Sequence, residues 1–380
     1  MKNYPENNSR KRVAFHFATL AQGGVERMRI VLAEEFMKNN IDVDFVLCRA
    51  EGPLLASVPP GVRIINLNVR RSMNSLPGLI GYLKREAPDV MVASLPHQNI
   101  SSIIAKRLSG ARTRVFVTFH NAMSEEGNAK NGSFIRLIPH VYKVLLPLAD
   151  GVIAVSQGVA RDLQERTGIS KGMVEVLYNP AFPSNLVERA GEPVMDPVFD
   201  ESSPLLISVG RLHPQKGYDT LLAAFARARN LINCRLAICG EGAELGRLQQ
   251  LAVELGVETY VNFLGFQENP LKYINRSSRF VMSSRYEGFG NVLVEALACG
   301  KPVISTNCNY GPSEIIDDPK YGILVPVDDI DSLSDAIVQS IKTEYDAEVL
   351  KKRAMEFSSE LVAMKYLDVL GLRKNLQRGG

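Results

Sequence analysis

Two cations stand five residues apart in a short turn-rich loop. Arg211 and Lys216 fall within the stretch VGRLHPQKG, residues 209–217, between an expected strand and an expected helix. Side chains that converge from a strand end and a helix start can hold a diphosphate, because guanidinium and ammonium groups both bind phosphate oxygens. Such a pair would neutralise a diphosphate leaving group without a metal ion. Taken alone, the loop fits two solvated surface cations equally well.

Two carboxylates mark a second junction of the same kind. Glu287 lies in a Gly-containing loop, a helix is expected to begin near Asn291, and Glu295 follows about one turn into it. Backbone amides at a helix start bind phosphate or sugar oxygens, and a carboxylate accepts hydrogen bonds from sugar hydroxyls. Glu295 interrupts an apolar run, where a charge needs a partner. A ribose diol would supply two donors; an exposed helix face is the alternative.

The first half of the chain offers two weaker signals. Gly23 and Gly24 follow an expected strand and open a helix, so the backbone there can approach a phosphate or a sugar hydroxyl, although a tight structural turn explains them as well. His120 follows the strand-like run Val115–Phe119. The carboxyl end of a strand is where ligands bind in α/β proteins, which favours a functional role for this histidine over a structural one.

These residues require elements that place them at strand ends. Short apolar runs alternate with amphipathic helical stretches, a pattern typical of βαβ units and parallel sheets. The helices expected in the first half include Val25–Lys38 and Asn99–Leu108; those in the second include Tyr218–Asn230, Asn291–Ala298, Ile330–Ile341, Tyr345–Met355 and Ser358–Leu372. The expected strands are Val13–Phe17, Val43–Leu47, Val90–Ala93, Val115–Phe119, Val152–Val155, Leu205–Val209, Leu236–Cys239, Val261–Phe263, Phe280–Met282 and Pro302–Ser305.

Length and composition predict two α/β domains that face a cleft. A chain of 380 residues is too long for one ordinary core, and its 46% hydrophobic and 22% charged residues are typical of a soluble globular protein. A Pro-rich polar stretch begins near residue 180. We therefore expect an N-terminal Rossmann-like domain over 1–182, a linker over 183–203, a second such domain over 204–357 and a C-terminal helix over 358–380.

Several classes of protein are disfavoured. The five cysteines show no C-x-x-C spacing, which argues against a zinc site and against a disulfide framework. Residues 1–12 lack the apolar core of a signal peptide, so a cytoplasmic location is expected. The Asp42-Val43-Asp44 triplet is formally a D-x-D metal motif but fits better as the polar start of a buried strand. The dinucleotide fingerprint of a nicotinamide dehydrogenase is missing.

The motifs together resemble the family 4 retaining glycosyltransferases of GT-B fold. The resemblance rests on the early GGVER stretch, on GRLHPQKG, on EGFGNVLVEALACGKPVI with its two glutamates, and on NYGPSEII followed by GILVP. These matches run in the family's order from residue 12 to about 330. The fold class expected is therefore α/β, with two Rossmann-like doubly wound parallel-sheet domains.

The resemblance implies a role for each matched residue. His120 and Glu287 would be the catalytic positions, with His120 beside the reacting carbon. Gly24 would approach the donor diphosphate from the first domain. The residues implied in donor binding are Gly24, Arg211, Lys216, Phe266, Glu287, Gly288, Phe289, Gly290, Asn291, Val292 and Glu295. Those implied in acceptor binding are Gln22, Gly23, Arg27, His97 and Asn121.

The activity expected is metal-independent transfer of a sugar with retention of configuration. The donor would be a nucleotide-diphosphate sugar, with a UDP-hexose or UDP-N-acetylhexosamine as the first expectation, and no cofactor is needed. The acceptor would be a glycan or lipid-linked saccharide in bacterial surface glycan synthesis. Same-face attack is favoured over double displacement through Glu287, and the sequence leaves both open. A GT-B sugar-nucleotide epimerase and a catalytically silent nucleotide-sugar-binding subunit are the alternatives.

The charge is unevenly distributed along the chain. Residues 1–180 carry 23 Lys and Arg against 15 Asp and Glu, a net charge of +8, whereas residues 181–380 carry 21 against 26. Without an aromatic-rich basic motif, nucleic acid is a poor candidate partner. We expect instead peripheral binding to the anionic inner face of the cytoplasmic membrane. The cations expected to contribute are Arg70, Arg71, Arg136, His140 and Lys143, the last three on one face of a helix.

Overall fold

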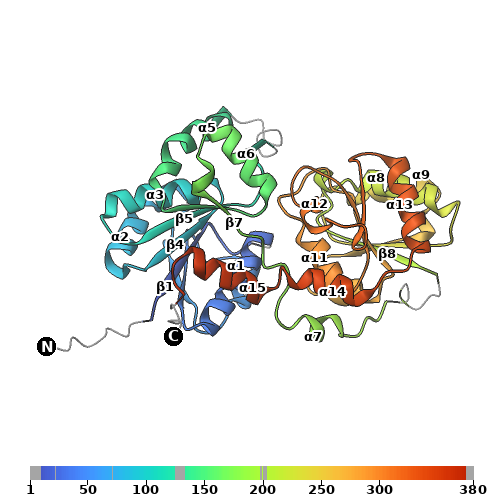
Figure 1. Ribbon diagram of the computed structural model, residues 1–380, viewed down its shortest axis with the longest axis horizontal. Helices are drawn as coiled ribbons and strands as arrows, with labels where there is room; N and C mark the ends of the chain where they lie inside the picture. Colours follow the sequence, from blue (N-terminus) through green and yellow to red (C-terminus); the bar gives the residue numbers. More distant parts are fainter. Residues whose placement is uncertain are drawn as a thin grey trace, which may run out of the picture. The chain divides into compact units, whose positions relative to one another are not determined.

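The computed structural model describes residues 10–373 except 22, 71, 125–132, 197–198 and 200–202. The chain divides into two compact units (Figure 1). The first comprises residues 1–155, 159–180 and 359–380, and the second comprises residues 156–158 and 181–358. Each unit has its own sheet and its own apolar core, so each is described by itself.

The first unit is built on a parallel sheet that has seven strands among the described residues, in the order β3-β2-β1-β4-β5-β6-β7. The central strands β1, β4 and β5 are buried along most of their length, because most of their residues are Val, Ala, Phe or Met. The strands are β1 (Arg12–Phe17), β2 (Asp42–Leu47), β3 (Arg63–Asn66), β4 (Val90–Ser94), β5 (Arg114–Phe119), β6 (Gly151–Ala154) and β7 (Val174–Val176).

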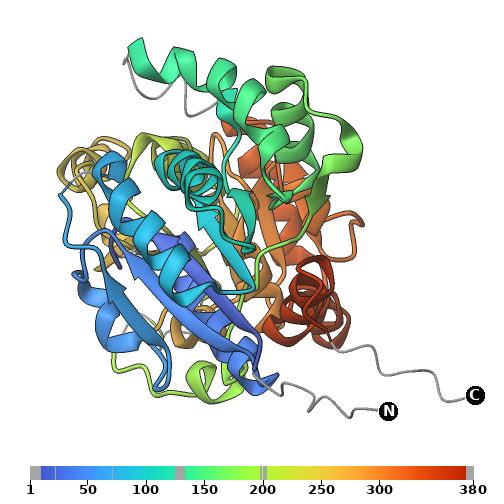
Figure 2. The same ribbon diagram turned by 90° about the vertical axis from the view of Figure 1, so that its left-hand side faces the viewer.

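Helices cover both faces of this sheet (Figures 1 and 2). Helix α1 (Gly24–Lys38) and the C-terminal helix α15 (Ser359–Val369) pack against each other and share one core with strands β1 and β2. Arg114 Nη2 donates a 2.5 Å hydrogen bond to the carbonyl of Leu370, which ties the end of this segment to β5. The other helices of the unit are α2 (Leu76–Glu86), α3 (Pro96–Ser109), α5 (Ser133–Leu145) and α6 (Gln157–Thr167).

The second unit repeats the scheme with a parallel sheet of six strands within the described residues, in the order β10-β9-β8-β11-β12-β13. Its strands are β8 (Leu205–Val209), β9 (Arg235–Cys239), β10 (Val261–Gly265), β11 (Arg279–Met282), β12 (Val303–Thr306) and β13 (Gly322–Val325). Its helices are α7 (Leu186–Ala190), α8 (Tyr218–Arg229), α9 (Leu245–Glu254), α10 (Leu271–Arg276), α11 (Asn291–Ala298), α12 (Pro312–Ile315), α13 (Ile330–Lys342) and α14 (Ala347–Met355).

The strands and helices expected from the sequence are present within one or two residues of their predicted bounds at most ends. Several elements were not predicted because their signals are weak. For example, β3 and β7 are short edge strands with exposed residues, and α2 contains two glycines and a proline. Residues 183–203, expected as a linker, contain the short helix α7 and lie in the second unit.

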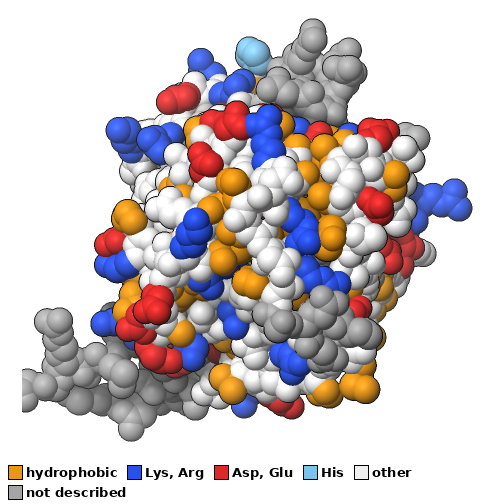
Figure 3. Space-filling model, turned by 90° about the vertical axis from the view of Figure 1, so that its right-hand side faces the viewer, with side chains coloured by type: hydrophobic (Ala, Val, Ile, Leu, Met, Phe, Trp, Pro, Cys, Tyr) orange, Lys and Arg blue, Asp and Glu red, His pale blue; other side chains and the backbone are white. Residues whose placement is uncertain are grey.

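Charges of both signs are interspersed on the face of the molecule in Figure 3, together with isolated hydrophobic side chains. Such mixing is typical of a solvated surface. Within the described residues, no helix combines the length and the apolar character that crossing a bilayer requires.

Gly217 fixes the start of helix α8 next to a second loop, which gives a test of the local backbone. Its φ is +59°, and a Cβ atom there would lie 2.2 Å from the carbonyl oxygen of Ser283. We expect Gly217→Ala to lower the stability of the second unit by about 2 kcal/mol, because both the left-handed backbone and the close carbonyl oppose a side chain. Urea unfolding followed by circular dichroism measures the change.

Gly246 in α9 is the matched control, because a Cβ atom there meets nothing within 4 Å. Gly246→Ala is expected to be neutral or slightly stabilising, since alanine is the better helix former. Equal urea midpoints for the Gly217→Ala variant and the wild type would contradict the close packing of the two loops.

Candidate functional site

An ion pair joins two loops at the carboxyl edge of the second unit's sheet. Lys216 Nζ donates to Glu287 Oε1 over 2.5 Å, and Ser284 Oγ donates to the same oxygen over 2.6 Å. The side chains of Lys216 and Glu287 are 19% and 11% exposed. The structure therefore brings together one cation and one carboxylate that the sequence predicted separately, and it keeps them near solvent where a ligand can reach them.

The two loops that carry this pair are joined by hydrogen bonds to their backbones. Ser283 Oγ donates to the carbonyl of Lys216 over 2.8 Å, and Gln215 Nε2 donates to the carbonyl of Tyr286 over 2.9 Å. The Arg285 amide also donates to the carbonyl of Gln215 over 2.7 Å. Strands β8 and β11 are neighbours in the sheet, so their following loops lie side by side. The positions of Lys216 and Glu287 thus depend on each other.

Arg285 is a residue of this site that the sequence analysis missed. Its guanidinium donates to both carboxylate oxygens of Asp219 over 3.0 and 3.1 Å, to Asp328 over 3.1 Å and to the carbonyl of Pro214 over 2.6 Å. The side chain therefore ties the loop after β11 to the start of α8 and to the loop before α13. Its position two residues before Glu287 was the available signal.

Helix α11 begins directly behind this pair. Gly290 precedes it with φ of +98°, and no side chain caps the helix start, the kind of backbone site at which phosphate and sugar oxygens bind. Phe289 is buried and packs against Phe357 with ring centroids 5.4 Å apart, which makes it a support for the loop rather than a surface contact. Asn291 and Glu295 are half-buried on the helix.

The remaining donor residues implied by the resemblance, with the exception of Gly24, lie at the same edge of the sheet. Arg211 directly follows the residue after β8 and is exposed, and Phe266 follows β10 with 41% of its surface exposed. The Phe266 amide donates to Glu241 Oε1 over 3.3 Å. Gly288 and Val292 belong to the same loop and helix start as Glu287 and Asn291. All these positions belong to the second unit.

Two buried hydrogen-bonding groups beside the pair are held neutral. Burial raises the pKa of Cys308 to about 12, with the Glu287 carboxylate acting in the same direction. Burial also raises the pKa of Tyr218, whose hydroxyl donates to the carbonyl of Gly210 over 3.1 Å. Neither group therefore adds a negative charge beside Lys216, which a phosphate would meet together with the exposed Arg211.

The first unit places the other predicted residues at the carboxyl edge of its own sheet. Gly23 is the residue before α1, Gly24 is exposed, and Arg27 is half-buried in the first turn. Gln22 lies outside the described residues. A Cβ atom on Gly24 would meet nothing within 4 Å, so no contact inside the protein explains that glycine. The space beside it is open to a ligand.

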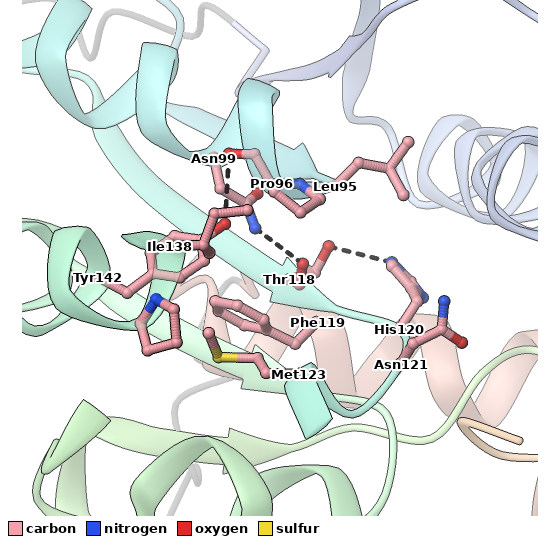
Figure 4. Close-up of a pocket in the computed structure, with 11 residues that line it drawn as sticks. Leu95, Pro96, Asn99, Thr118, Phe119, His120, Asn121, Met123, Ile138 and Tyr142 are labelled. Carbon is pink, nitrogen blue, oxygen red and sulfur yellow. Dashed lines mark hydrogen bonds between the residues drawn. The ribbon is translucent and has the colours of Figure 1, made fainter. Parts of the chain in front are cut away.

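His120 lies beside a small pocket between β5, α3 and α5 (Figure 4). The cavity volume is about 30 Å³, enough for two or three water-sized groups. His120 Nε2 is 3.1 Å from Thr118 Oγ1, and burial together with the charge of Arg29 holds the pKa of His120 well below its usual value. The pocket is lined by Leu95, Pro96, Asn99, Thr118, Phe119, His120, Asn121, Met123, Ile138, Pro139 and Tyr142.

Asn121 thus joins His120 at the pocket, whereas the exposed His97 lies in the first turn of α3. The Asp42-Val43-Asp44 triplet is part of β2, and Asp44 is buried and hydrogen-bonded to Arg63 and to Tyr82. Its carboxylate is therefore occupied within the protein. Within the described part of the chain, no group of three or more His, Cys, Asp or Glu side chains could hold a metal ion.

Two Rossmann-like units, each with its candidate residues at the carboxyl edge of a parallel sheet, define the GT-B class of fold. The solved structure of Anabaena Alr3699/HepE in complex with UDP has this architecture: it aligns with a TM-score of 0.76 and 21% identity, over 95% of this chain and 99% of that one. The protein belongs to the glycosyltransferases that combine two family domains: Glycosyltransferase Family 4 over residues 22–182 and Glycosyl transferases group 1 over residues 195–357.

Two named relatives come from bacterial glycan synthesis. The chain is 34% identical over 235 residues to the N-acetylgalactosamine-N,N'-diacetylbacillosaminyl-diphospho-undecaprenol 4-alpha-N-acetylgalactosaminyltransferase of Campylobacter jejuni, covering 59% of this chain and 61% of that protein. It is 35% identical over 173 residues to the lipopolysaccharide core biosynthesis glycosyltransferase LpsE of Rhizobium meliloti, covering 44% and 50%. The matches therefore span less than two thirds of the length of either relative.

The geometry of the second unit gives a direct test of the cation pair. We expect Arg211→Ala and Lys216→Ala each to lose roughly 2–4 kcal/mol of transition-state stabilisation, on the scale of a lost charge-assisted contact to a leaving group. The kcat/KM for release of nucleoside diphosphate from the donor measures the loss. Lys216→Ala is also expected to lower the melting temperature slightly, because Glu287 then keeps only Ser284 as a partner.

Lys351→Ala is the control for removal of one positive charge. Lys351 is on α14 and pairs with Glu348 at the surface. Turnover should be unchanged in this variant. Near-wild-type turnover in both Arg211→Ala and Lys216→Ala would show that these cations do not hold the diphosphate.

Proposed function

We propose that the protein is a glycosyltransferase that moves a sugar from a nucleoside-diphosphate donor to a glycan or lipid-linked acceptor, with retention of configuration. The observation that carries the proposal is the junction of Lys216, Glu287 and the uncapped start of α11 at one sheet edge. A cation, a carboxylate and the backbone amides of a helix start match the diphosphate and the hydroxyls of a sugar nucleotide. The family domains and the named relatives support the same reaction.

In the proposed reaction the bond between the anomeric carbon and the diphosphate breaks while the charge on the leaving oxygen is compensated. Lys216, Arg211 and the first amides of α11 supply that compensation. The acceptor hydroxyl attacks from the face that the diphosphate leaves, and its proton passes to the leaving phosphate oxygen. Glu287 is already hydrogen-bonded to Lys216 and Ser284, which favours contact with sugar hydroxyls over nucleophilic attack.

The donor proposed is a UDP-hexose or a UDP-N-acetylhexosamine. The similar Anabaena protein has been crystallised with UDP-glucose, and the Campylobacter relative is named for the transfer of N-acetylgalactosamine to a diphospho-undecaprenol-linked sugar. A lipid-linked or surface-glycan acceptor follows by analogy with that relative and with LpsE. Most of the proposed donor-binding residues belong to the second unit, whereas Gly24 and the proposed acceptor-binding residues belong to the first.

The function is tested by incubating the protein with a panel of sugar nucleotides and lipid-linked saccharides in excess EDTA. We expect one UDP-sugar to be consumed with release of UDP, and the sugar to appear on the acceptor as the same anomer, because Arg211 and Lys216 replace a metal ion. Mass spectrometry detects UDP and the glycosylated acceptor, and NMR of the product gives the anomeric configuration.

Other outcomes of this assay would contradict parts of the proposal. Formation of an epimeric free sugar and UDP without any acceptor would identify an epimerase. Binding of UDP without turnover on any donor would identify a silent binding subunit. Loss of activity in EDTA that Mg²⁺ or Mn²⁺ restores would contradict metal independence alone.

We further propose that the first unit binds the anionic inner surface of the cytoplasmic membrane. Arg70, His140 and Lys143 are exposed, as is Val144, at 69%. Lys143 and Val144 thus present a cation and an apolar group at the end of α5, the pairing that suits an anionic lipid interface. Arg71 and the side chain of Arg136, which the sequence analysis assigned to the same surface, lie outside the described residues.

Vesicle co-sedimentation tests the membrane proposal. We expect binding to anionic vesicles at low salt, weak binding to neutral ones, and release as salt rises, since each cation near the surface contributes about 1 kcal/mol that salt screens. Exchange of Arg70, Arg71, Arg136 and Lys143 for Glu should weaken binding and leave donor hydrolysis intact.

The matched control exchanges four exposed cations of the second unit for Glu, namely Arg227, Arg247, Lys320 and Lys351. If the first-unit variant and this second-unit control lose vesicle binding equally, the effect is a non-specific one of net charge. Equal binding of the wild type to neutral and anionic vesicles would contradict the electrostatic mechanism.

A further inference from the structure

Arg29 is a cation in the middle of an apolar core. It lies on α1 and is fully buried, and no carboxylate of the described residues forms an ion pair with it. Its ring neighbours are Phe15 and Tyr366, whose centroids are 5.2 and 5.5 Å from the guanidinium carbon. Burying an ion without a counter-charge costs several kcal/mol even after relaxation. Packing alone would favour a methionine or leucine at this position, so the charge requires another explanation.

The guanidinium is directed at two hydroxyl groups at the ends of neighbouring strands. Arg29 Nη2 donates to Thr118 Oγ1 over 2.8 Å and to Ser94 Oγ over 3.1 Å, and Arg29 Nε lies 3.3 Å from the same serine oxygen. Thr118 is in turn 3.1 Å from His120 Nε2, the contact drawn in Figure 4. A chain of hydrogen-bonding distances therefore leads from the buried cation to the histidine at the pocket.

The donors and acceptors around Thr118 determine where its proton goes. A hydroxyl has one proton to donate and two lone pairs. The carbonyl of Ala93, 2.8 Å away, only accepts hydrogen bonds, whereas Arg29 only donates them. Thr118 therefore donates to Ala93 and accepts from Arg29. Ser94 Oγ, 2.9 Å from Thr118 Oγ1, is a third neighbour that can offer a proton to Thr118 but receives none from it. Because Thr118 has no second proton to offer, His120 Nε2 must carry a proton of its own to bond with it.

We propose that Arg29 is a positioning residue that acts through Thr118 to hold His120 as the neutral imidazole protonated on Nε2. In this state Nδ1 keeps its lone pair and accepts a hydrogen bond from a substrate hydroxyl. The identification of that hydroxyl as belonging to a sugar rests on the proposed function; the assignment of the proton on His120 does not.

The charge of Arg29 and the hydroxyl of Thr118 have separate effects. The charge opposes a second proton on His120, and burial acts in the same direction, so the pKa of His120 is held well below its usual value. The hydroxyl selects which nitrogen carries the single proton. Besides His120, the titratable side chain that lines the pocket is Tyr142 on α5, and its hydroxyl donates to the carbonyl of Pro96 over 3.2 Å.

The test uses the full chain with ¹⁵N-labelled histidine and long-range ¹H–¹⁵N spectra, which distinguish the two neutral forms of the ring. Loss of one signal in His120→Gln assigns the residue. The wild type should show His120 protonated on Nε2. Thr118→Val should produce a mixture of both neutral forms, whereas Thr118→Ser, which keeps the hydroxyl, should preserve the wild-type form.

The charge is tested in the same spectra across a pH titration. Arg29→Met should raise the pH at which His120 takes up a second proton by roughly one unit, the effect of removing a nearby like charge. Arg29→Lys, which keeps the positive charge, should bring that pH most of the way back to the wild-type value. Arg85→Met, which removes an exposed cation from α2, should leave His120 unchanged.

Several results would overturn the proposal. A wild-type His120 protonated on Nδ1 would contradict it directly. If His120 stays protonated only on Nε2 in Thr118→Val, the role of the Thr118 hydroxyl is contradicted. If the pKa of His120 is unchanged in folded Arg29→Met, the role of the Arg29 charge is contradicted. If Arg29→Met does not fold, the wild-type spectrum and the two Thr118 variants still decide the assignment of the proton. Absence of glycosyl transfer with every donor would contradict the proposed function while leaving this spectroscopic result intact.

Discussion

The site residues of both units depend on one constraint, namely that the strands of a parallel sheet all end at the same edge. Each strand that continues into a loop and a helix brings backbone amides and side chains to that edge. These groups lie beyond the hydrogen-bonded part of the sheet and can therefore contact a ligand. In the second unit this places the loops after the adjacent strands β8 and β11 side by side, and Lys216 meets Glu287 although 71 positions separate them along the chain. In the first unit it places Ser94 at the end of β4 next to Thr118 near the end of β5.

The two units use this edge with different electrostatics. The second unit holds an ion pair near solvent: Lys216 and Glu287 neutralise each other, and Ser284 donates to the same carboxylate oxygen as Lys216. In the proposed reaction, a diphosphate that approaches Lys216 would compete with Glu287, and the displaced carboxylate would then accept hydrogen bonds from sugar hydroxyls. The first unit instead presents neutral groups at its pocket and keeps its cation, Arg29, behind them. A charge in that position can bias protonation without binding an anion itself.

The sequence predicts the parts of this arrangement that depend on local pattern. The largely apolar run of β1 and the helical period of α1 can each be recognised over a few residues. The motifs around Arg211, Lys216 and Glu287 point to one kind of ligand. Contacts between distant residues are not readable in the same way. Arg285 binds Asp219 and Asp328, 66 and 43 positions away, and only its place two residues before Glu287 distinguishes it from a surface arginine in the sequence. The ion pair between Lys216 and Glu287 belongs to the same class, since it arises from strand order.

Arg29 shows that a residue with long-range contacts can also be recognised from its immediate sequence neighbours. It precedes Leu32, Ala33 and Phe36 by three, four and seven residues, the spacing of one helix face, and those three side chains are fully buried. An arginine at a core position of an otherwise regular amphipathic helix is therefore a conflict visible in the sequence. Its two ring neighbours and two hydroxyl partners offset part of the desolvation of the guanidinium. The extensive core that α1 and α15 share with the sheet tolerates the remaining cost, because the burial of one aliphatic or aromatic side chain alone contributes about 1.5–3 kcal/mol. A core of this size can hold one uncompensated charge, and the structure places that charge where its field reaches His120.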